Sequence, residues 1–465
     1  MTNRCSPPLT YRDIVRSGLC IGCGACAVKR SGATLQMQFD RYGQLKPKEA
    51  GDLKSAPQVE FPSICPFSPL AENEDDLAAR HFATAAKCDP LLGRFEKAFV
   101  GHVEEGDFRA NGSSGGLVTW VAAELLQRGL VDAVAHVGET DSGDRLFRYR
   151  LSRSIEDLKA GAKSRYYPVE LSGVLDAIRT TPGRYAVIGV PCFIKAVRLS
   201  CANDPVLNER ISFTLGLFCG HMKSARMAES FAWQMGAAIA DVEHFDYRVK
   251  RVDRPANWYR AQVTLPHQDV IGRDWWHLAD GDWGAGFFQN SACNFCDDVV
   301  AETADIAFGD AWAQPYAADG RGTNVVIIRS AALLDLVNNA VISRRIVLSL
   351  VDEEFVARTQ AAGFRQRREG LAFRLTWLRP DRRPRKRVAA GAGSLTWRRR
   401  MIYRLRYAIS AWSHRIFWFS HLLRRPQLYL AWARIVSFLY QGFAYSRGPI
   451  GRIVDRIGRS GAETD

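Results

Sequence analysis

The sequence lacks any long apolar run. No stretch reaches the roughly 18 apolar residues that a membrane-spanning helix needs, and arginines interrupt the most apolar part of the C-terminal segment, at positions 415, 424, 425 and 434. The first 16 residues are polar and lack the apolar core of a secretory signal. These absences argue against a polytopic membrane protein and favour a cytoplasmic location.

Acidic residues are scarce at one end only. Residues 381–465 hold 18 Arg or Lys but 4 Asp or Glu, whereas residues 1–380 hold 45 of each. A neutral globular body therefore carries a basic tail. The composition, 47% hydrophobic and 24% charged, excludes wholesale disorder and collagen. Nucleic acid is an unlikely partner, because the positive charge stays outside the body and accompanies no recognised binding motif.

Residues 93–345 alternate between short buried strands and helices with a helical apolar repeat. The expected strands are 98–103, 131–137, 185–190, 211–218, 305–309 and 324–329. The expected helices are 117–128, 193–199, 224–235 (with Ser224 as N-cap) and 331–342. Strand–helix–strand units predict an α/β fold on a mostly parallel sheet. Residues 243–275 add α+β character, since their alternation predicts antiparallel strands.

Three cysteines share one short loop near the start of the chain. The run Cys20-Ile-Gly-Cys23-Gly-Ala-Cys26 has the spacing C-x2-C-x2-C, and Cys65 is followed by Pro66. This pattern is typical of a [4Fe-4S] cluster. Zinc, the alternative, favours separated C-x2-C pairs. We therefore predict a [4Fe-4S] cluster held by Cys20, Cys23, Cys26 and Cys65.

Four further cysteines could form a second site. Cys192 and Cys219 each follow a predicted parallel strand, where open α/β sheets place their sites. Cys293 and Cys296 form a lone C-x2-C pair. The chemistry of four thiols leaves iron–sulfur and zinc both open. Small buried structural residues are the other interpretation of Cys192 and Cys219.

A glycine-rich loop lies between the first strand and the first helix of the α/β region. It consists of Asn111, Gly112, Ser113, Ser114, Gly115 and Gly116. Glycines permit close backbone approach, serines add donors, and a helix N-terminus favours anions, so a phosphate or pyrophosphate would fit. An ordinary turn is the alternative, since the loop does not match G-x-G-x-x-G. Residues 163–167 are basic and aromatic, which suits a phosphate or a ring but also a solvated loop.

In their order along the chain, these motifs resemble the family of coenzyme F420 hydrogenase/dehydrogenase beta subunits, to which 7-hydroxymethyl chlorophyll a reductase also belongs. The Cys20–Cys26 run with Cys65-Pro66 is similar to the family's N-terminal cluster motif. Arg109 to Gly116 resembles its flavin loop, and Ser164-Arg165-Tyr166 its S-K/R-Y motif. The later matches are Gly189-Val-Pro-Cys192, Phe218-Cys219-Gly220, Cys293-x2-Cys296 and Asp305 to Trp312. The resemblance covers about residues 15–345.

The resemblance implies FAD beside the iron–sulfur clusters. The residues implied to bind FAD are Arg109, Asn111, Gly112, Ser113, Ser114, Gly115, Gly116, Ser164, Arg165 and Tyr166. The ligands implied for a second [4Fe-4S] cluster are Cys192, Cys219, Cys293 and Cys296. The substrate is not fixed, since members of the family reduce a deazaflavin, a tetrapyrrole or unknown compounds.

We expect four regions in the chain. Residues 1–92 form a ferredoxin-like iron–sulfur segment, and residues 93–345 form an FAD-binding domain like that of the family. Residues 346–380 form a helical extension. Residues 381–465 form a helical, basic and aromatic tail, whose first part, 381–394, has the Pro, Arg, Ala and Gly content of a linker.

The tail mixes arginine with aromatic and aliphatic residues from Trp397 to Tyr445. Such a mixture suits an interfacial helix on an anionic membrane surface. A helical cap packed on the body and a partner-binding arm are the alternatives. We therefore expect a cytoplasmic chain attached peripherally to the inner face of the membrane.

These features predict an iron–sulfur flavoprotein oxidoreductase. Electrons from a ferredoxin-like donor would enter at the N-terminal cluster, reach FAD and leave to an organic acceptor, or run in reverse. No acid–base residue stands out, and the candidates are His102, His136, His221 and Asp310. The alternative is a non-enzymatic electron-transfer or scaffold subunit of a membrane-associated biosynthetic complex.

Overall fold

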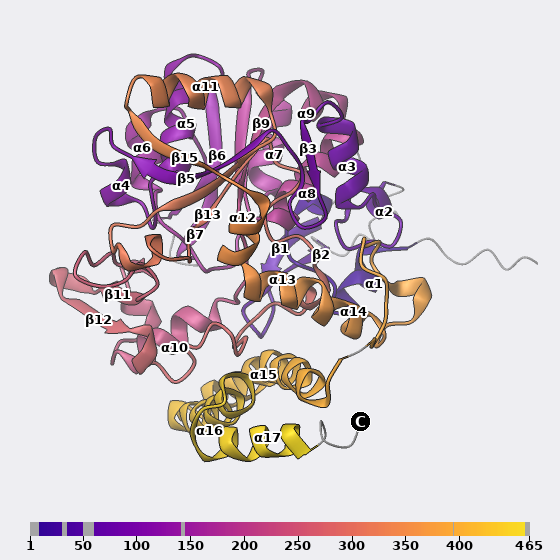
Figure 1. The fold of residues 1–465 in the computed structure, drawn as a ribbon, viewed down its shortest axis with the longest axis vertical. Helices are drawn as coiled ribbons and strands as arrows, with labels where there is room; N and C mark the ends of the chain where they lie inside the picture. Colours follow the sequence, from indigo (N-terminus) through magenta and orange to yellow (C-terminus); the bar gives the residue numbers. More distant parts are fainter. Residues whose placement is uncertain (1–8, 30–34, 50–59, 141–144, 394, 461–465) are drawn as a thin grey trace, which may run out of the picture.

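An eight-stranded mixed sheet forms the centre of the computed structural model, which describes residues 9–29, 35–49, 60–140, 145–393 and 395–460 (Figure 1). In spatial order the strands are β15 (Ile346–Val351), β5 (Lys97–Val103), β14 (Asn324–Ile328), β13 (Ile306–Asp310), β9 (Ile211–Leu217), β8 (Tyr185–Gly189), β6 (Ala133–Glu139) and β7 (Phe147–Ser152). The six strands expected between residues 98 and 329 are all present. Their buried, β-branched and aromatic residues fit a sheet that is covered on both faces.

The sheet is not mostly parallel, so that prediction is wrong. The pairs β13–β9, β9–β8 and β8–β6 are parallel, whereas the other four neighbouring pairs are antiparallel. Strand β5 does run in the same direction as β6, but β14, β13, β9 and β8 lie between them. A crossover helix fixes the direction of the next strand but does not make the two strands neighbours.

Helices cover both faces of the sheet. On one face, α5 (Leu117–Gln127) and α11 (Ala331–Ile342) bury apolar side chains against the strands. On the other face, α7 (Ser172–Thr180) and α8 (Pro191–Ala202) do the same. The remaining short helices of this region are α4 (Phe108–Asn111), α6 (Ile155–Ala160) and α9 (Pro205–Arg210).

One expected helix start is wrong, and one expected small sheet is present. Helix α10 spans Arg226–Gln234 with Ala225 as its N-cap, and the buried Ser224 hydroxyl has no hydrogen-bond partner among the described residues. Ser224 therefore does not cap the helix. The antiparallel sheet lies beside it, formed by β10 (His244–Asp246), β11 (Arg260–Thr264) and β12 (Val270–Asp274).

The N-terminal segment consists of short elements joined by loops. They are α1 (Tyr11–Arg16), η1 (Ala25–Ala27), β1 (Leu35–Phe39), β2 (Leu45–Glu49), α2 (Phe61–Ile64), α3 (Glu74–His81), β3 (Lys87–Asp89) and β4 (Gly93–Phe95). Several of its buried residues, among them Ile14, Ile21 and Phe61, belong to the same apolar cluster as α7 and α8. The segment thus packs directly on one face of the central sheet.

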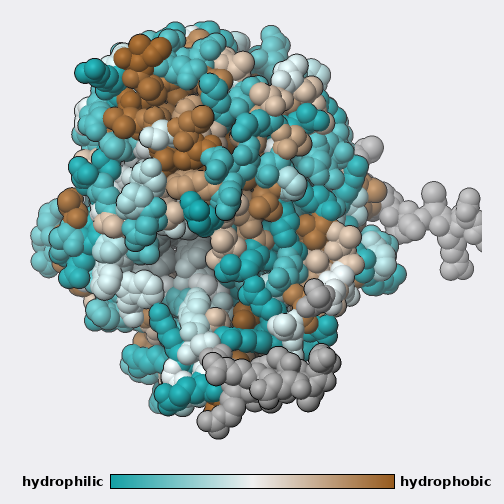
Figure 2. All heavy atoms as spheres, in the orientation of Figure 1, coloured by the Kyte–Doolittle hydropathy of each residue, from teal (hydrophilic) through white to brown (hydrophobic). Residues whose placement is uncertain are grey.

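The expected helical extension begins with a strand. Strand β15 pairs with β5 at the edge of the central sheet, and only then follow α12 (Glu353–Thr359), α13 (Ala361–Arg367) and α14 (Glu369–Leu375). On this face of the molecule, exposed apolar side chains gather where α11 and β15 lie, and they include Ile342 and Leu350 (Figure 2). The start of the extension is therefore part of the α/β body.

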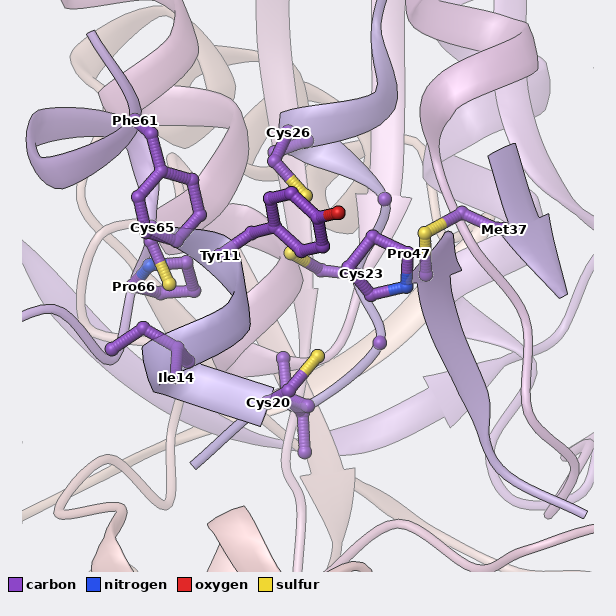
Figure 3. Close-up of a pocket in the computed structure, with 14 residues that line it drawn as sticks. Tyr11, Ile14, Cys20, Cys23, Cys26, Met37, Pro47, Phe61, Cys65 and Pro66 are labelled. Atoms are coloured by element: carbon purple, nitrogen blue, oxygen red, sulfur yellow. The ribbon is translucent and has the colours of Figure 1, made fainter. Parts of the chain in front are cut away.

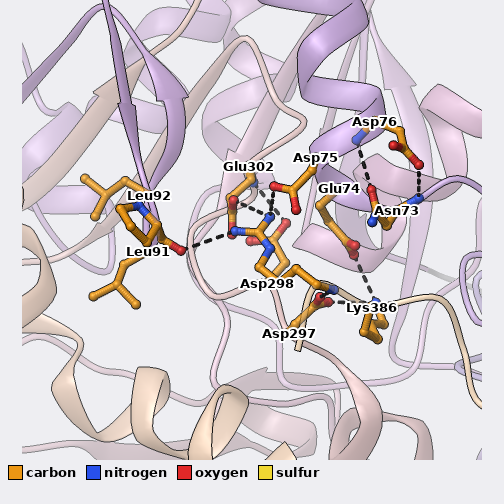
Figure 4. A network of polar contacts seen from close by, with 12 residues as sticks. Asn73, Glu74, Asp75, Asp76, Leu91, Leu92, Asp297, Asp298, Glu302 and Lys386 are labelled. Carbon is orange, nitrogen blue, oxygen red and sulfur yellow. Dashed lines mark hydrogen bonds and ion pairs between the residues drawn. The ribbon is translucent and has the colours of Figure 1, made fainter. Parts of the chain in front are cut away.

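Residues 381–393, which we name the strap, do not form a free linker. Within the strap, the side chain of Lys386 is 2% exposed, and its Nζ lies 3.1 Å from Glu74 Oε1 and 2.7 Å from Asp297 Oδ1 (Figure 4). A buried cation needs such carboxylate partners, because it gives up its hydration. The strap is thus pinned to the body, and the linker prediction is wrong for its described residues.

The tail forms three helices that pack on the body through one side. They are α15 (Trp397–Leu422), α16 (Pro426–Tyr445) and α17 (Gly448–Ser460). Phe417 and Tyr429 are buried in the apolar cluster that also contains Phe288. The tail is therefore a helical cap, the first of the alternatives above. Among the described helices, none is both long and apolar enough to cross a bilayer.

Candidate metal and cofactor site

Four sulfur atoms face one cavity in the N-terminal segment (Figure 3). Cys20, Cys23 and Cys26 come from the loop before and within η1, and Cys65 comes from the end of α2. The loop turns around the cavity at Gly22 and Gly24, whose φ angles of 83° and 81° favour glycine. The ring of Tyr11 and the apolar side chains of α1 and α2 line the remaining wall.

The cavity cannot hold four thiolates without a compensating cation. Burial, helped by the nearby Cys20 and Glu170, raises the pKa of Cys23 to about 12. Burial and the neighbouring thiols also raise the pKa values of Cys26 and Cys65 far above their usual range. An iron–sulfur core supplies such positive charge, so the residues present fit that group.

The same cysteines can also be considered as ligands of a single metal ion. In the part of the chain that the structure describes, no group of three or more His, Cys, Asp or Glu side chains is placed to hold a metal ion. The thiolates of a cubane cluster each bind a different iron, so they need not approach one another as the ligands of one ion do.

The second set of cysteines lies in one buried group. Cys192 stands at the start of α8, Cys219 follows β9, and Cys293 belongs to η5 (Ser291–Phe295), with Cys296 directly after it. Burial raises the pKa of Cys192 well above its usual range, and Cys296, Cys219 and Cys293 raise it further. The backbone N–H of Met222 points at Cys293 Sγ over 3.2 Å. Such an N–H···S contact favours an anionic sulfur.

The two cysteine sites are neighbours. Cys192 and Cys23 are close enough to influence each other's charge, and both belong to one apolar cluster. Tyr149 stands beside both, since burial, Cys192 and Cys23 together raise the pKa of its hydroxyl. That hydroxyl donates to the carbonyl of Ile188 over 2.8 Å and stays neutral. An apolar contact thus joins the two sites.

The glycine-rich loop meets the Ser164-Arg165-Tyr166 motif. The backbone N–H of Ser164 donates to Ser113 Oγ over 2.8 Å. Lys250, which sequence reasoning missed, donates to the carbonyls of Ser114 (2.8 Å) and Arg109. Burial, helped by the nearby Arg109 and Lys163, lowers the pKa of Lys250 to about 8. Two of these cations already have carboxylate partners, since Arg109 pairs with Asp319 (3.0 Å) and Lys163 pairs with Asp246 (2.8 Å).

The glycines of this loop are required by protein packing. A Cβ on Gly115 would lie 2.7 Å from the carbonyl oxygen of Gly101 and 2.9 Å from the backbone nitrogen of Asn324. The first N–H of α5, that of Leu117, donates to Asn324 Oδ1. The exposed part of the loop is therefore Asn111, with Ser113 and Ser114 half-buried.

A cavity of about 340 Å³ opens beside the loop. Asn111, Lys163 and Arg165 line it, and the remaining wall comes largely from α6, β10 and β11. Its volume falls in the usual range of ligand pockets. Two carboxylates, Glu139 and Asp246, also line it.

Tyr166 begins an aromatic path toward the second cysteine site. Its ring lies 4.9 Å from that of Trp283, which stacks on His221 at 4.2 Å. His221 follows Cys219 by two residues, and its Nδ1 accepts a hydrogen bond from Arg406 Nη2 over 3.1 Å. The S-R-Y motif and the cysteine group are thus linked by two ring contacts.

Of the four acid–base candidates, His221 alone lies at the cysteines. His136 is buried and paired with Ser152 Oγ at 2.7 Å, and burial lowers its pKa to about 4. His102 pairs with Glu104. Asp310 forms a double ion pair with Arg248. These partners give His136, His102 and Asp310 structural roles.

The chain belongs to the family of coenzyme F420 hydrogenase/dehydrogenase beta subunits. The model of the family's N-terminal part matches residues 98–176, and that of its C-terminal part matches residues 183–354. The family predicted from the order of the motifs is therefore confirmed. The cysteine run, the strap and the tail lie outside the matched residues.

Relatives with known names are distant. The coenzyme F420-dependent sulfite reductase of Methanocaldococcus jannaschii is 23% identical over 314 residues, 64% of this chain and 43% of that protein. A subunit of the F420H2 dehydrogenase of Methanosarcina mazei is 22% identical over 335 residues, 70% of this chain and 82% of that protein. In a solved structure of the F420-reducing [NiFe] hydrogenase complex from Methanosarcina barkeri, one chain is 18% identical with a TM-score of 0.47, over 60% of this chain and 92% of that one. The chain thus spans less than half of the sulfite reductase.

Proposed function

We propose that this protein is an iron–sulfur flavoprotein oxidoreductase that passes electrons between a ferredoxin-like donor and an organic acceptor. The observation that carries the proposal is the adjacency of two groups of four cysteines, one of which adjoins the aromatic path to the family's flavin motif. The names of the relatives, a reductase and part of a dehydrogenase, support a redox role.

Each group of cysteines would hold one [4Fe-4S] cluster. Bound there, the clusters would supply one-electron transfer, and FAD would convert single electrons into pairs. The protein's own contribution is to bury the thiols, to exclude water around Tyr149, and to keep the two sites in contact.

FAD would bind at the glycine-rich loop and the S-R-Y motif. Ser113, Ser114 and Arg165 would face its phosphates, and Lys250 would hold the loop in shape. Tyr166 and Trp283 would offer aromatic surface to a ring. The cavity beside Asn111 supports this placement.

The acceptor would be a deazaflavin or a tetrapyrrole. The names of both relatives point to coenzyme F420, a deazaflavin. A non-enzymatic electron-transfer subunit is the second candidate, which is favoured by the name of the Methanosarcina mazei relative as one part of a larger dehydrogenase. Either candidate requires protein partners that donate or receive electrons.

The outer side of the tail would rest on an anionic membrane. Apolar side chains on α15 and α16 are more than half exposed, namely Trp412, Phe419, Leu422, Ile435 and Phe438. Exposed arginines stand among them, at positions 415, 424, 425 and 434. This combination suits the headgroup layer on the inner face of the membrane.

Anaerobic variants test the clusters, and flavin turnover tests the enzyme. Cys23→Ser and Cys293→Ser should each lose about half of the bound iron while the other cluster's signal persists. Photoreduced wild-type protein should return electrons to added deazaflavin within one turnover. Bound flavin that stays reduced with every acceptor offered, but is oxidised by a partner protein, would favour the non-enzymatic electron-transfer role instead.

A further inference from the structure

Arg367 is buried against the second cysteine site without a carboxylate to pair with. It ends α13 and is 3% exposed. Its Nη2 donates to the carbonyls of Cys219 and Gly220, over 2.8 and 2.7 Å. Its Nε and Nη1 have no hydrogen-bond partner among the described residues. Two buried donors of a permanent cation are thus left for a group that the protein itself does not supply.

The surroundings of Arg367 are anionic only if the thiols are ionised. Burial by itself lowers the pKa of Arg367, whereas Cys296, Cys219 and Cys293 raise it overall and do so more than Asp298. The three cysteines are therefore the natural electrostatic partners of this guanidinium.

Two more buried arginines stand nearby with neutral partners only. Arg374 of α14 donates to the backbone of Asn294, which lies between Cys293 and Cys296, and to Gln366. Arg406 of α15 donates to Gly284 and Gln289 and pairs with His221. Desolvation lowers the pKa of Arg374 to about 9, helped by Arg406 and Arg367. The described contacts thus leave an excess of positive charge beside the cysteines.

We infer that Arg367 is a positioning and charge-compensating residue for the Cys192/Cys219/Cys293/Cys296 site, and that it raises the reduction potential of the cluster held there. The inference rests on the second cluster of the proposed function. A thiolate-ligated cluster is anionic and gains a further negative charge on reduction. A fixed cation beside it stabilises the reduced form more than the oxidised form, so the potential rises.

The three arginines lie beyond residue 354, where the family match ends. The segment after residue 354 therefore contributes positively charged side chains to the second cysteine site, whose four cysteines all come earlier in the chain. Arg406 is the contribution of the tail, next to His221 and Gln289.

The test compares Arg367→Met, which removes the charge, with Arg367→Lys, which keeps it. Arg365→Met is the matched control, because Arg365 is an exposed residue of the same helix. The readouts are iron content and the midpoint potentials of both clusters, followed by EPR in anaerobic redox titrations. The Cys20/Cys23/Cys26/Cys65 cluster serves as an internal reference in every variant.

We expect Arg367→Met to make reduction of the second cluster at least about tenfold less favourable, a fall of about 59 mV for a one-electron couple. Arg367→Lys should shift it less, and Arg365→Met should not shift it. Loss of iron from the second site alone in Arg367→Met, with iron retained in Arg367→Lys, would also support the role of the charge.

Three outcomes would overturn the inference, and they are distinguishable. Equal potentials in wild type, Arg367→Met and Arg365→Met would show that the charge has no effect, although the second cluster exists. Equal iron in wild type and Cys293→Ser would show that no second cluster is bound, which removes that part of the proposed function as well. Arg367→Lys behaving like Arg367→Met would also contradict compensation by charge.

Discussion

Lys386 of the strap forms a buried ion pair with Asp297, the residue directly after Cys296, with 2.7 Å between Nζ and Oδ1 (Figure 4). The same Nζ lies 3.1 Å from Glu74, which also pairs with the buried Lys195. The neighbouring Arg387 reaches Glu302 at 2.6 Å. The strap thus closes a network that joins α3, α8 and the segment that follows the second cysteine site.

Removal of the Lys386 charge should destabilise the protein strongly. Lys386→Met leaves the buried carboxylates of Glu74 and Asp297 short of a partner, which costs about 3–5 kcal/mol of unfolding free energy. Arg385→Met is the control, because the Arg385–Asp76 pair is solvent-exposed and contributes at most about 1 kcal/mol. Urea unfolding of the anaerobic holoprotein measures both. Equal midpoints for the two variants would show that the strap is not pinned by this pair.

His136 should make stability depend on pH. Burial lowers the pKa of its imidazole from 6.5 to about 4 in the folded protein, so between these values the unfolded state binds the extra proton. The neutral His136 therefore contributes about 3 kcal/mol to the free energy of unfolding above pH 6.5, and this contribution is lost as the pH falls toward 4. His136→Gln should keep the contact with Ser152 and flatten this part of the stability profile.

The control for His136 is another buried histidine. Burial also lowers the pKa of His414 to about 4, so the variant should lose part of the slope and keep the rest. Unfolding free energies at pH 7, 6 and 5 give the slope. An unchanged slope in His136→Gln would mean that His136 is not held neutral by burial.

Lys250 should be needed for flavin retention. Lys250→Met removes the donor to the carbonyls of Arg109 and Ser114, so the loop loses its shape and a nearby cation. We expect FAD to bind about tenfold more weakly, a loss of about 1.4 kcal/mol. Arg128→Met, at the far end of α5, is the control. The measurement is the fluorescence of the flavin that is released on dilution. Equal flavin affinities of wild type and Lys250→Met would show that Lys250 is not part of the flavin site.

Gly115→Val is a poor test of the same loop. Its side chain would collide with Gly101 and Asn324, so flavin would be lost through distortion of the sheet whether or not the loop touches phosphate.

The outer side of the tail should bind anionic vesicles. The double variant Trp412→Ser, Phe419→Ser removes two half-exposed aromatic rings from α15 and should lower sedimentation with phosphatidylglycerol vesicles severalfold. Ile342→Ser, an exposed apolar residue on α11 at the opposite end of the molecule, is the control (Figure 1). Wild-type protein that stays in the supernatant at low salt would show that this surface does not bind anionic membranes.

Truncation at Pro380 is unsuitable as a test of membrane binding, because it would expose the core around Phe417.

Much of the α/β body could be predicted because its strands are short apolar runs with clear ends. Helix α11 spans the expected residues 331–342. The direction of β14 and β5 could not be predicted, since a strand's apolar pattern is the same in parallel and antiparallel pairs. Residues 346–351 fall within the expected helical extension, although their run Ile-Val-Leu-Ser-Leu-Val has the β-branched character of an edge strand.

The cysteines could be predicted as candidates because their spacing carries the signal. Lys386, Arg367 and Arg406 could not, because an arginine or lysine in a basic stretch looks like surface charge until its burial is known. Lys250 had no motif around it either. The grouping of these cations depends on tertiary contacts between the tail and the body, for which the sequence holds no local pattern.

The central claim is that eight cysteines hold two iron–sulfur clusters side by side. Its most direct test is the metal, sulfide and flavin content of anaerobically purified, full-length protein, with EPR after reduction. The account predicts about eight iron and eight labile sulfide per chain, since each cubane contains four of each, with signals from two clusters. Stoichiometric zinc without iron, and no signal from a reduced cluster, would contradict it.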